Sequence, residues 1–117
     1  MKVVVSARGI TPESEVDPRF GRASHFLVFD TGNGSWEPVD NTQSLTAAHG
    51  AGIQAAETVC RHGAGIVISG HVGPKAFRVL SAGGVQVFRG DGRTAAEALA
   101  AFQNGSLVEI TGSDGQH

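Results

Sequence analysis

The stretch that decides the fold is Ile66-Val67-Ile68-Ser69-Gly70-His71-Val72-Gly73-Pro74, in which an apolar run passes through two glycines into a helix start. Ile66 to Ile68 is uninterrupted and β-branched, the pattern of a strand that is covered on both faces. Gly73 followed by Pro74 predicts the start of a helix, because proline suits the first helical position. The stretch therefore indicates one strand-to-helix unit of an α/β domain.

The residues before this unit predict a first strand, a hairpin and a helix. Val3-Val4-Val5 is a second buried strand of the same type. Phe26 to Phe29 and Trp36 to Val39 flank a turn-rich segment and predict an antiparallel hairpin. Pro38 cannot donate a hydrogen bond to a ladder, so it places the second hairpin strand at the edge of the sheet. A helix is expected from about His49 to His62.

The residues after the unit continue the alternation of strand and helix. Val85 to Phe88 predicts another strand, and Thr94-Ala95-Ala96-Glu97 has the form of a capping box that opens a third helix. Leu107 to Ile110 is a candidate for one further short strand. We expect a single α/β domain over residues 1–112, with a mixed five-stranded sheet flanked by about three helices. Residues 113–117 are expected to form a flexible tail.

Composition narrows the class of protein. The chain has 117 residues and a net charge of −2, which argues against a nucleic-acid-binding surface. No apolar run approaches the roughly 18 residues needed to cross a bilayer, so a soluble cytoplasmic protein without a membrane partner is expected. Cys60 is the single cysteine, so one chain cannot supply the about four thiolates of an ordinary iron–sulfur cluster. Its place on the apolar stripe of the predicted helix indicates a core residue.

Two glycine-rich elbows, His49-Gly50-Ala51-Gly52 and Gly70-His71-Val72-Gly73-Pro74, each open a predicted helix. A helix N-terminus presents unpaired N–H groups, and glycine lets a bulky anion approach the backbone. The long loop from Arg8 to Ser24 leaves the same edge of the sheet as the second elbow. Its Arg19 and Arg22 either pair with acids of the loop or close over an anion. The sequence therefore predicts an anion-binding site without a catalyst.

Other site chemistries fit the sequence poorly. A metal-dependent nuclease needs carboxylates on its strands, and Lys2 to Ser6 offers none. Nothing around Ser69 forms a nucleophile elbow with an orienting acid. Lys75 does not stand in a Walker loop, and neither His49 nor His71 has partners at zinc spacing. We therefore predict no catalytic residue and no protein metal ligand.

In their order along the chain, these motifs resemble the dinitrogenase iron–molybdenum cofactor biosynthesis family, which includes NifX-like proteins and the C-terminal domain of NifB. The resemblance runs from Met1 to about Gly105. It is carried by Val16-Asp17-Pro18-Arg19-Phe20-Gly21-Arg22-Ala23, by the His49 elbow and by Gly70 to Lys75. It implies a ribonuclease H-like α/β domain that binds or carries preformed metal–sulfur clusters without turnover.

The chain length and lone cysteine resemble those of family members from anaerobic sulfate reducers. That resemblance implies a noncovalent, sulfide-bridged molybdenum–copper cluster as the cofactor, with an iron–molybdenum cofactor precursor as the alternative. P-loop ATPases and other cofactor-assembly proteins are the protein partners that the family implies. Two further functions stay open: a regulatory module for a phosphorylated metabolite, and a structural partner domain in cofactor assembly.

The resemblance also implies a set of cofactor-binding residues. Carried over by motif, the set is Arg19, Gly21, Arg22, His49, Gly50, Gly52, Gly70, His71 and Gly73. Arg8 joins the set because of its position after the first strand.

Overall fold

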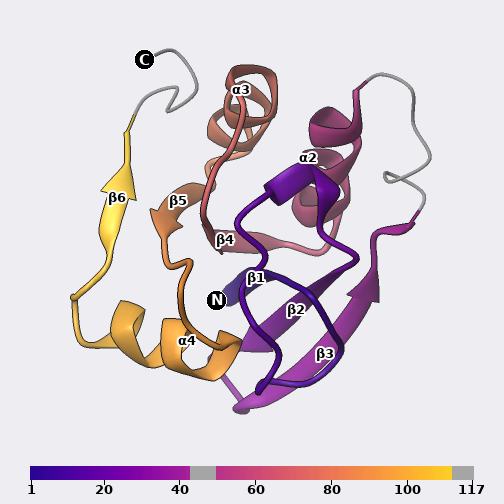
Figure 1. Cartoon of the computed structure of the whole chain (residues 1–117). Helices are drawn as coiled ribbons and strands as arrows, with labels where there is room; N and C mark the ends of the chain where they lie inside the picture. Colours follow the sequence, from indigo (N-terminus) through magenta and orange to yellow (C-terminus); the bar gives the residue numbers. More distant parts are fainter. Residues whose placement is uncertain (43–49, 112–117) are drawn as a thin grey trace.

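A mixed six-stranded sheet forms the centre of the molecule (Figure 1). The computed structural model describes residues 1–42 and 50–111. The strands are β1 (Lys2–Ala7), β2 (His25–Asp30), β3 (Ser35–Asp40), β4 (Ala64–Ser69), β5 (Gln86–Arg89) and β6 (Val108–Ile110). The helices are the 3₁₀ turn η1 (Phe20–Arg22), α2 (Ala51–Arg61), α3 (Pro74–Ala82) and α4 (Ala95–Gln103).

The strand order β3-β2-β1-β4-β5-β6 places the two β-branched strands at the centre. β1 pairs with β4 and β4 with β5 in parallel, whereas β2, β3 and β6 join their neighbours antiparallel. The parallel pairs direct the carboxyl ends of β1, β4 and β5 to one edge. Sequence-based placement of β3 at the border of the sheet is confirmed, with Pro38 paired only to β2.

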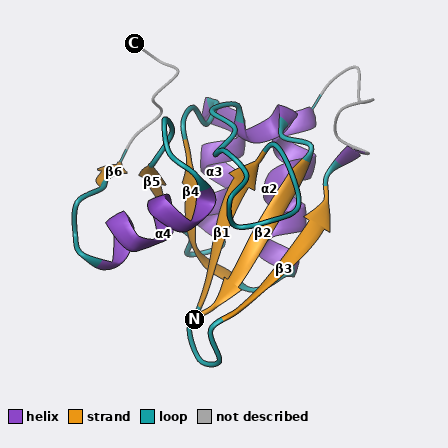
Figure 2. Ribbon diagram, turned by 60° about the horizontal axis from the view of Figure 1, so that its bottom comes forward, coloured by secondary structure: helices purple, strands orange, loops and turns teal. Residues whose placement is uncertain are grey.

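Side chains from both faces of the sheet are buried, as the apolar runs predict. Val4 packs in the cluster shared with α2 and α3, whereas Val3 and Val5 pack in the cluster shared with α4. Figure 2 shows α4 on one side of the sheet and α2 and α3 on the other. Because successive residues of a strand point to opposite faces, a run without polar residues fills both layers.

The prediction of five strands is wrong, because β6 adds a sixth. Val108–Ile110 runs antiparallel along the free edge of β5, with Val87 opposite Ile110 and Arg89 opposite Val108. Leu107 and Ile110 are buried, so this pairing also covers apolar side chains at the border of the sheet. The expectation of three flanking helices agrees with α2, α3 and α4 in the described part of the chain. The ribonuclease H-like class stays a prediction.

Local signals in the sequence locate the helix ends well. Pro74 begins α3 and Gly83 caps its end, while α2 ends at Arg61 and begins at Ala51. Thr94 and Glu97 form the predicted capping box of α4. None of the described helices is long and apolar enough to span a bilayer. The predicted tail, 113–117, and the residue His49 lie outside the described residues.

The loop between β1 and β2 follows a defined path across the carboxyl edge of the sheet. Short bridges pair Ala7 with Val16 and Arg19 with His71. The amide of Val16 donates to the carbonyl of Arg93 at 2.9 Å. These bonds give the backbone groups of the loop the partners that a strand finds in its neighbours. They therefore hold η1 in place beside α2.

The capping box of α4 generates a stability prediction. Thr94 Oγ1 accepts the Glu97 amide at 3.2 Å, and Glu97 Oε1 accepts the Thr94 amide at 2.9 Å. We expect Thr94→Ala to lower the free energy of unfolding by about 1 kcal/mol, because one amide loses its acceptor. Urea unfolding at an unchanged m-value measures the loss. Thr94→Ser keeps the oxygen and is the control; an equal loss in Thr94→Ser would show that the methyl group, not the cap, matters.

Candidate functional site

An open pocket of about 770 Å³ lies where η1 meets the N-terminal ends of α2 and α3. Its position is the carboxyl edge of the parallel strands, where ligands bind in open α/β sheets. Its lining residues come from three short segments of the chain. They are Arg19, Phe20, Gly21, Arg22, Gly50, Ala51, Gly52, Ile53, His71, Gly73, Pro74, Lys75 and Ala76.

The two helices that open onto the pocket have no side-chain caps. Gly50 and Gly73 are their N-cap residues and carry no side chain that could accept a hydrogen bond from the first turn. Neither first turn contains an acidic residue, in contrast to α4 with its capping box. The leading N–H groups of α2 and α3 therefore present partial positive charge to the pocket.

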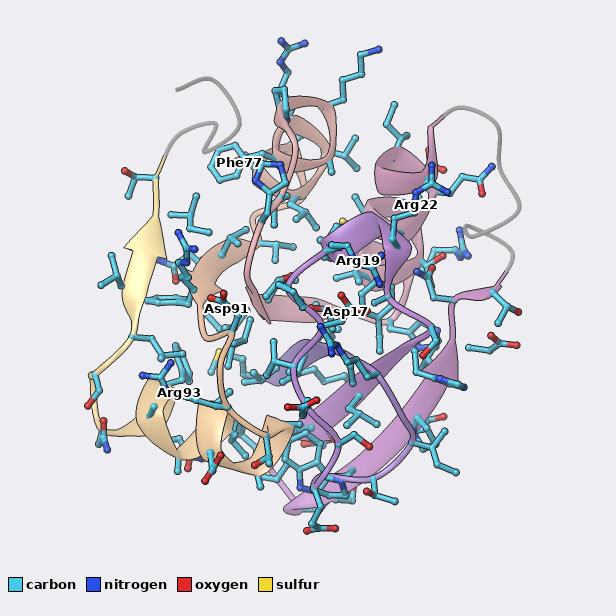
Figure 3. The ribbon with its side chains drawn as sticks, in the orientation of Figure 1. Asp17, Arg19, Arg22, Phe77, Asp91 and Arg93 are labelled. Carbon is cyan, nitrogen blue, oxygen red and sulfur yellow. The ribbon has the colours of Figure 1, made fainter. Side chains whose placement is uncertain are left out.

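The charged side chains of the pocket have one sign. Arg19, Arg22 and Lys75 line it together with His71, and among residues 1–42 and 50–111 no aspartate or glutamate lines it. The chain as a whole carries a net charge of −2, so positive charge is concentrated locally. Arg22 lies beyond Arg19 along the same segment (Figure 3). Fixed donors and cations around one cavity favour an anion.

The wall that carries Arg19 is attached to the ends of β1 and β4. Ser6 Oγ donates to the carbonyl of Asp17 at 2.8 Å and is hydrogen-bonded to Ser69 Oγ at 2.7 Å, and all three residues are buried. On the other side of Arg19, the His71 carbonyl accepts the Phe20 amide at 3.1 Å. The loop is therefore fixed on both sides of the arginine.

Two predicted site glycines serve close packing of backbone on backbone. A Cβ on Gly21 would lie 2.8 Å from Cα of Gly52, and a Cβ on Gly70 would lie 2.7 Å from Cα of Pro18. These contacts join η1 to α2 and the loop to β4. Gly50 has a different reason, because its φ of 75° is a conformation that side chains disfavour.

Most of the predicted binding residues meet at the pocket. Those that line it are Arg19, Gly21, Arg22, Gly50, Gly52, His71 and Gly73. Arg8 and Gly70 are not among the lining residues. Arg8 is exposed and its Nη1 lies 3.7 Å from Oε1 of Glu15, whereas Gly70 is buried beneath Pro18. His49 lies outside the described residues.

Sequence reasoning missed several pocket residues. Ile53 looks like a core residue of the helix stripe, but it is half-buried and faces the cavity. The sequence leaves Lys75 equally open to a site role and to a solvated one; it is exposed and lines the pocket from the first turn of α3. The available signal was their position, since both follow a glycine elbow within one helical turn.

Cys60 lies away from this pocket, half-buried against the α2 and α3 core. Burial, followed by the nearby charge of Glu57, raises the pKa of the Cys60 thiol. The neutral form is therefore favoured, and neutral thiols are weak metal ligands. Within residues 1–42 and 50–111, histidine, cysteine, aspartate and glutamate form no group of three that could hold a metal ion.

The fold and the pocket define a small α/β domain with hydrogen-bond donors and cations around one cavity. The sequence profile of the dinitrogenase iron-molybdenum cofactor family matches residues 1–105. The chain belongs to this family, as the order of its motifs predicts. Proteins of this family take part in the binding or biosynthesis of a metal–sulfur cofactor.

Solved structures of similar sequence share the fold. The apo form of the orange protein from Desulfovibrio gigas is 41% identical, with a TM-score of 0.93 over 97% of this chain and 95% of the other. A Thermotoga protein provisionally assigned to NifB is 38% identical, with a TM-score of 0.84 over 94% of this chain and 93% of the other. An uncharacterized protein of Methanocaldococcus jannaschii is 28% identical over 83% of this chain and 84% of its own length.

The glycines at the second elbow generate a matched pair of variants. We expect Gly70→Ala to lower the free energy of unfolding by about 1–3 kcal/mol, because its Cβ would collide with the backbone of Pro18. Gly73 has nothing within 4 Å of a Cβ and a φ of −66°, so Gly73→Ala should change stability by no more than about 0.5 kcal/mol, because the smaller freedom of the unfolded chain offsets the poorer fit of alanine to a helix N-cap. Thermal unfolding of both variants measures the difference; equal losses would contradict the packing role of Gly70.

Proposed function

We propose that the protein is a non-enzymatic carrier that binds an anionic, molybdenum-containing metal–sulfur cluster in the pocket between η1, α2 and α3. The observation that carries the proposal is the concentration of donors and cations around that pocket, with no carboxylate lining it in the part of the chain that the structure describes. Membership of the iron-molybdenum cofactor family supports the cluster as the ligand.

The pocket combines charge with an apolar wall. Ala51, Ile53, Pro74 and Ala76 provide aliphatic surface between the basic side chains. A sulfide-covered cluster has a diffuse charge and a weakly hydrated surface, so it gains from apolar contact as well as from N–H donors. A volume of about 770 Å³ accommodates a polyatomic ligand of this kind.

The finer proposal is a noncovalent, sulfide-bridged molybdenum–copper cluster, with an iron–molybdenum cofactor precursor as the alternative. Such a cluster supplies its own inner sulfide ligands. The protein then needs to provide only hydrogen bonds and charge beside its apolar wall, and Arg19, Arg22, Lys75 and the uncapped starts of α2 and α3 are groups that do this. The half-buried Cys60, with its raised pKa, stays outside the ligand set.

We also propose a cytoplasmic setting, in keeping with a single cysteine that has no pairing partner in the chain. Delivery of the cluster to other cofactor-assembly proteins, P-loop ATPases among them, is part of the same proposal and rests on the family alone.

The direct test adds tetrathiomolybdate to the protein under anaerobic conditions, with and without copper(I). The visible spectrum and the metal content are measured after gel filtration. We expect a coloured species that elutes with the protein and requires both metals. Binding of molybdenum alone would support only the broader carrier function. A colourless protein under every condition, together with binding of phosphate esters, would favour the regulatory module instead.

Arginine variants test whether this pocket is the binding site. We expect Arg19→Ala combined with Arg22→Ala to weaken binding about a hundredfold, since hydrogen bonds to charged groups contribute about 1.5 kcal/mol or more each. Arg78→Ala is the control, because Arg78 is an exposed arginine of α3 that does not line the pocket. Equal binding by the double variant and the control would place the site elsewhere.

A further inference from the structure

Asp17 is a buried carboxylate at the rim of the pocket. It is 2% exposed. Its Oδ1 accepts the Arg19 amide at 2.9 Å and Arg19 Nε–H at 3.3 Å, and its Oδ2 accepts from Arg19 Nη2 at 3.4 Å. Figure 3 labels both residues on the loop that crosses the sheet edge. A buried charge is costly, and exchange of a buried ion pair for apolar residues is often neutral or stabilising. The bond to the Arg19 amide shapes the turn, but the ion pair with the guanidinium adds little stability by itself.

The backbone of Asp17 is held in place by hydrogen bonds to the end of β1. Its amide donates to the Ser6 carbonyl at 2.8 Å, and its own carbonyl accepts Ser6 Oγ at 2.8 Å. The next carbonyl, that of Pro18, accepts the amide of His71 at 2.6 Å. The carboxylate is thus a fixed point, set by the central strands of the sheet.

The side chain of Arg19, unlike the buried carboxylate of Asp17, is 66% exposed. The carboxylate holds the edge of the guanidinium that carries Nε and one proton of Nη2, which leaves the Nη1 donors for other partners. Arg19 also lines the pocket. A free arginine side chain would lose rotamer entropy on meeting a ligand, and an anchored one has already lost it.

We propose that Asp17 is a positioning residue of the anion site: it holds the guanidinium of Arg19 with its outer donors ready for the ligand. This inference rests on the proposed function, since it concerns how Arg19 meets the anion.

Charge alone and positioning predict opposite effects for the same substitution. Asp17→Asn removes a negative charge at the rim of an anion pocket, so a purely Coulombic effect would tighten binding. Positioning predicts weaker binding, because the amide cannot bind both guanidinium nitrogens as a carboxylate does. The side-chain oxygen of asparagine still accepts the Arg19 amide, so the turn itself is retained.

The test measures the dissociation constant of tetrathiomolybdate for the wild type and for Asp17→Asn. We expect binding to weaken about 3- to 10-fold in the variant, the size that follows from ordering one long side chain. Asp91→Asn is the matched control, because Asp91 also pairs with the arginine two residues away, with Arg89 Nε 3.2 Å from its Oδ1, and does not line the pocket. The control should bind as the wild type does. Unchanged or tighter binding by Asp17→Asn would overturn the proposal.

A double-mutant cycle separates positioning from a general loss of structure. In an Arg19→Ala background, Asp17→Asn should produce no further weakening, because the residue it orients is gone. An undiminished effect in that background would assign Asp17 a structural role. If Asp17→Asn does not fold, Arg19→Lys examines the same contact, since it keeps the charge and loses the planar fork. Wild-type affinity in Arg19→Lys would overturn the proposal.

A measurement without ligand keeps the two proposals distinguishable. The exchange of the Arg19 Nε–H with solvent, followed by NMR, should be slow in the wild type and several-fold faster in Asp17→Asn. If the wild type binds no tetrathiomolybdate but shows this difference, the proposed function fails while the anchoring of Arg19 holds. Equal exchange rates would overturn the positioning of Arg19 whatever the protein binds.

Discussion

The edge of the sheet that carries the pocket depends on hydrogen bonds between Ser6, Asp17 and Ser69. Ser6 is the last residue but one of β1, and Ser69 ends β4. The buried Ser6 hydroxyl is hydrogen-bonded both to Ser69 Oγ and to the carbonyl of Asp17 in the loop that follows β1. Buried polar groups are costly when unpaired and specific when satisfied. This small network therefore converts a long loop into a rigid wall of the pocket, and the positions of η1 and Arg19 follow from it.

The electrostatics of the pocket arise from an unequal treatment of the helix ends. In α4, the side chains of Thr94 and Glu97 cap the N-terminal end of the helix by accepting backbone amides. The N-cap residues of α2 and α3 are glycines, so the first amides of these helices have no side-chain acceptor and lie at the cavity. Arg19, Arg22 and Lys75 add charge around the same opening. A pocket on a protein of net negative charge can thus favour an anion, because the relevant field is local and comes from these basic side chains together with the backbone dipoles of the two helices.

Glycine serves two separate purposes at this edge. Gly50 and Gly73 leave the helix ends without caps, and both line the pocket. Gly21 and Gly70 instead let segments distant in sequence approach to distances that a Cβ would forbid. A motif rich in glycine therefore combines residues that leave helix ends open to the pocket with residues that bring its walls together, and only the neighbours of each position distinguish them.

The sequence by itself determined the elements with local causes: the β-branched strands covered on both faces, the helix start at Pro74 and the capping box at Thr94. These features depend on neighbours within a few residues along the chain. The tertiary structure alone decided that Val108–Ile110 pairs with β5, that Gly70 packs beneath Pro18 and that Arg8 pairs with Glu15 and does not line the pocket. These outcomes depend on contacts between segments far apart in the sequence, and the packing of the whole domain sets those contacts.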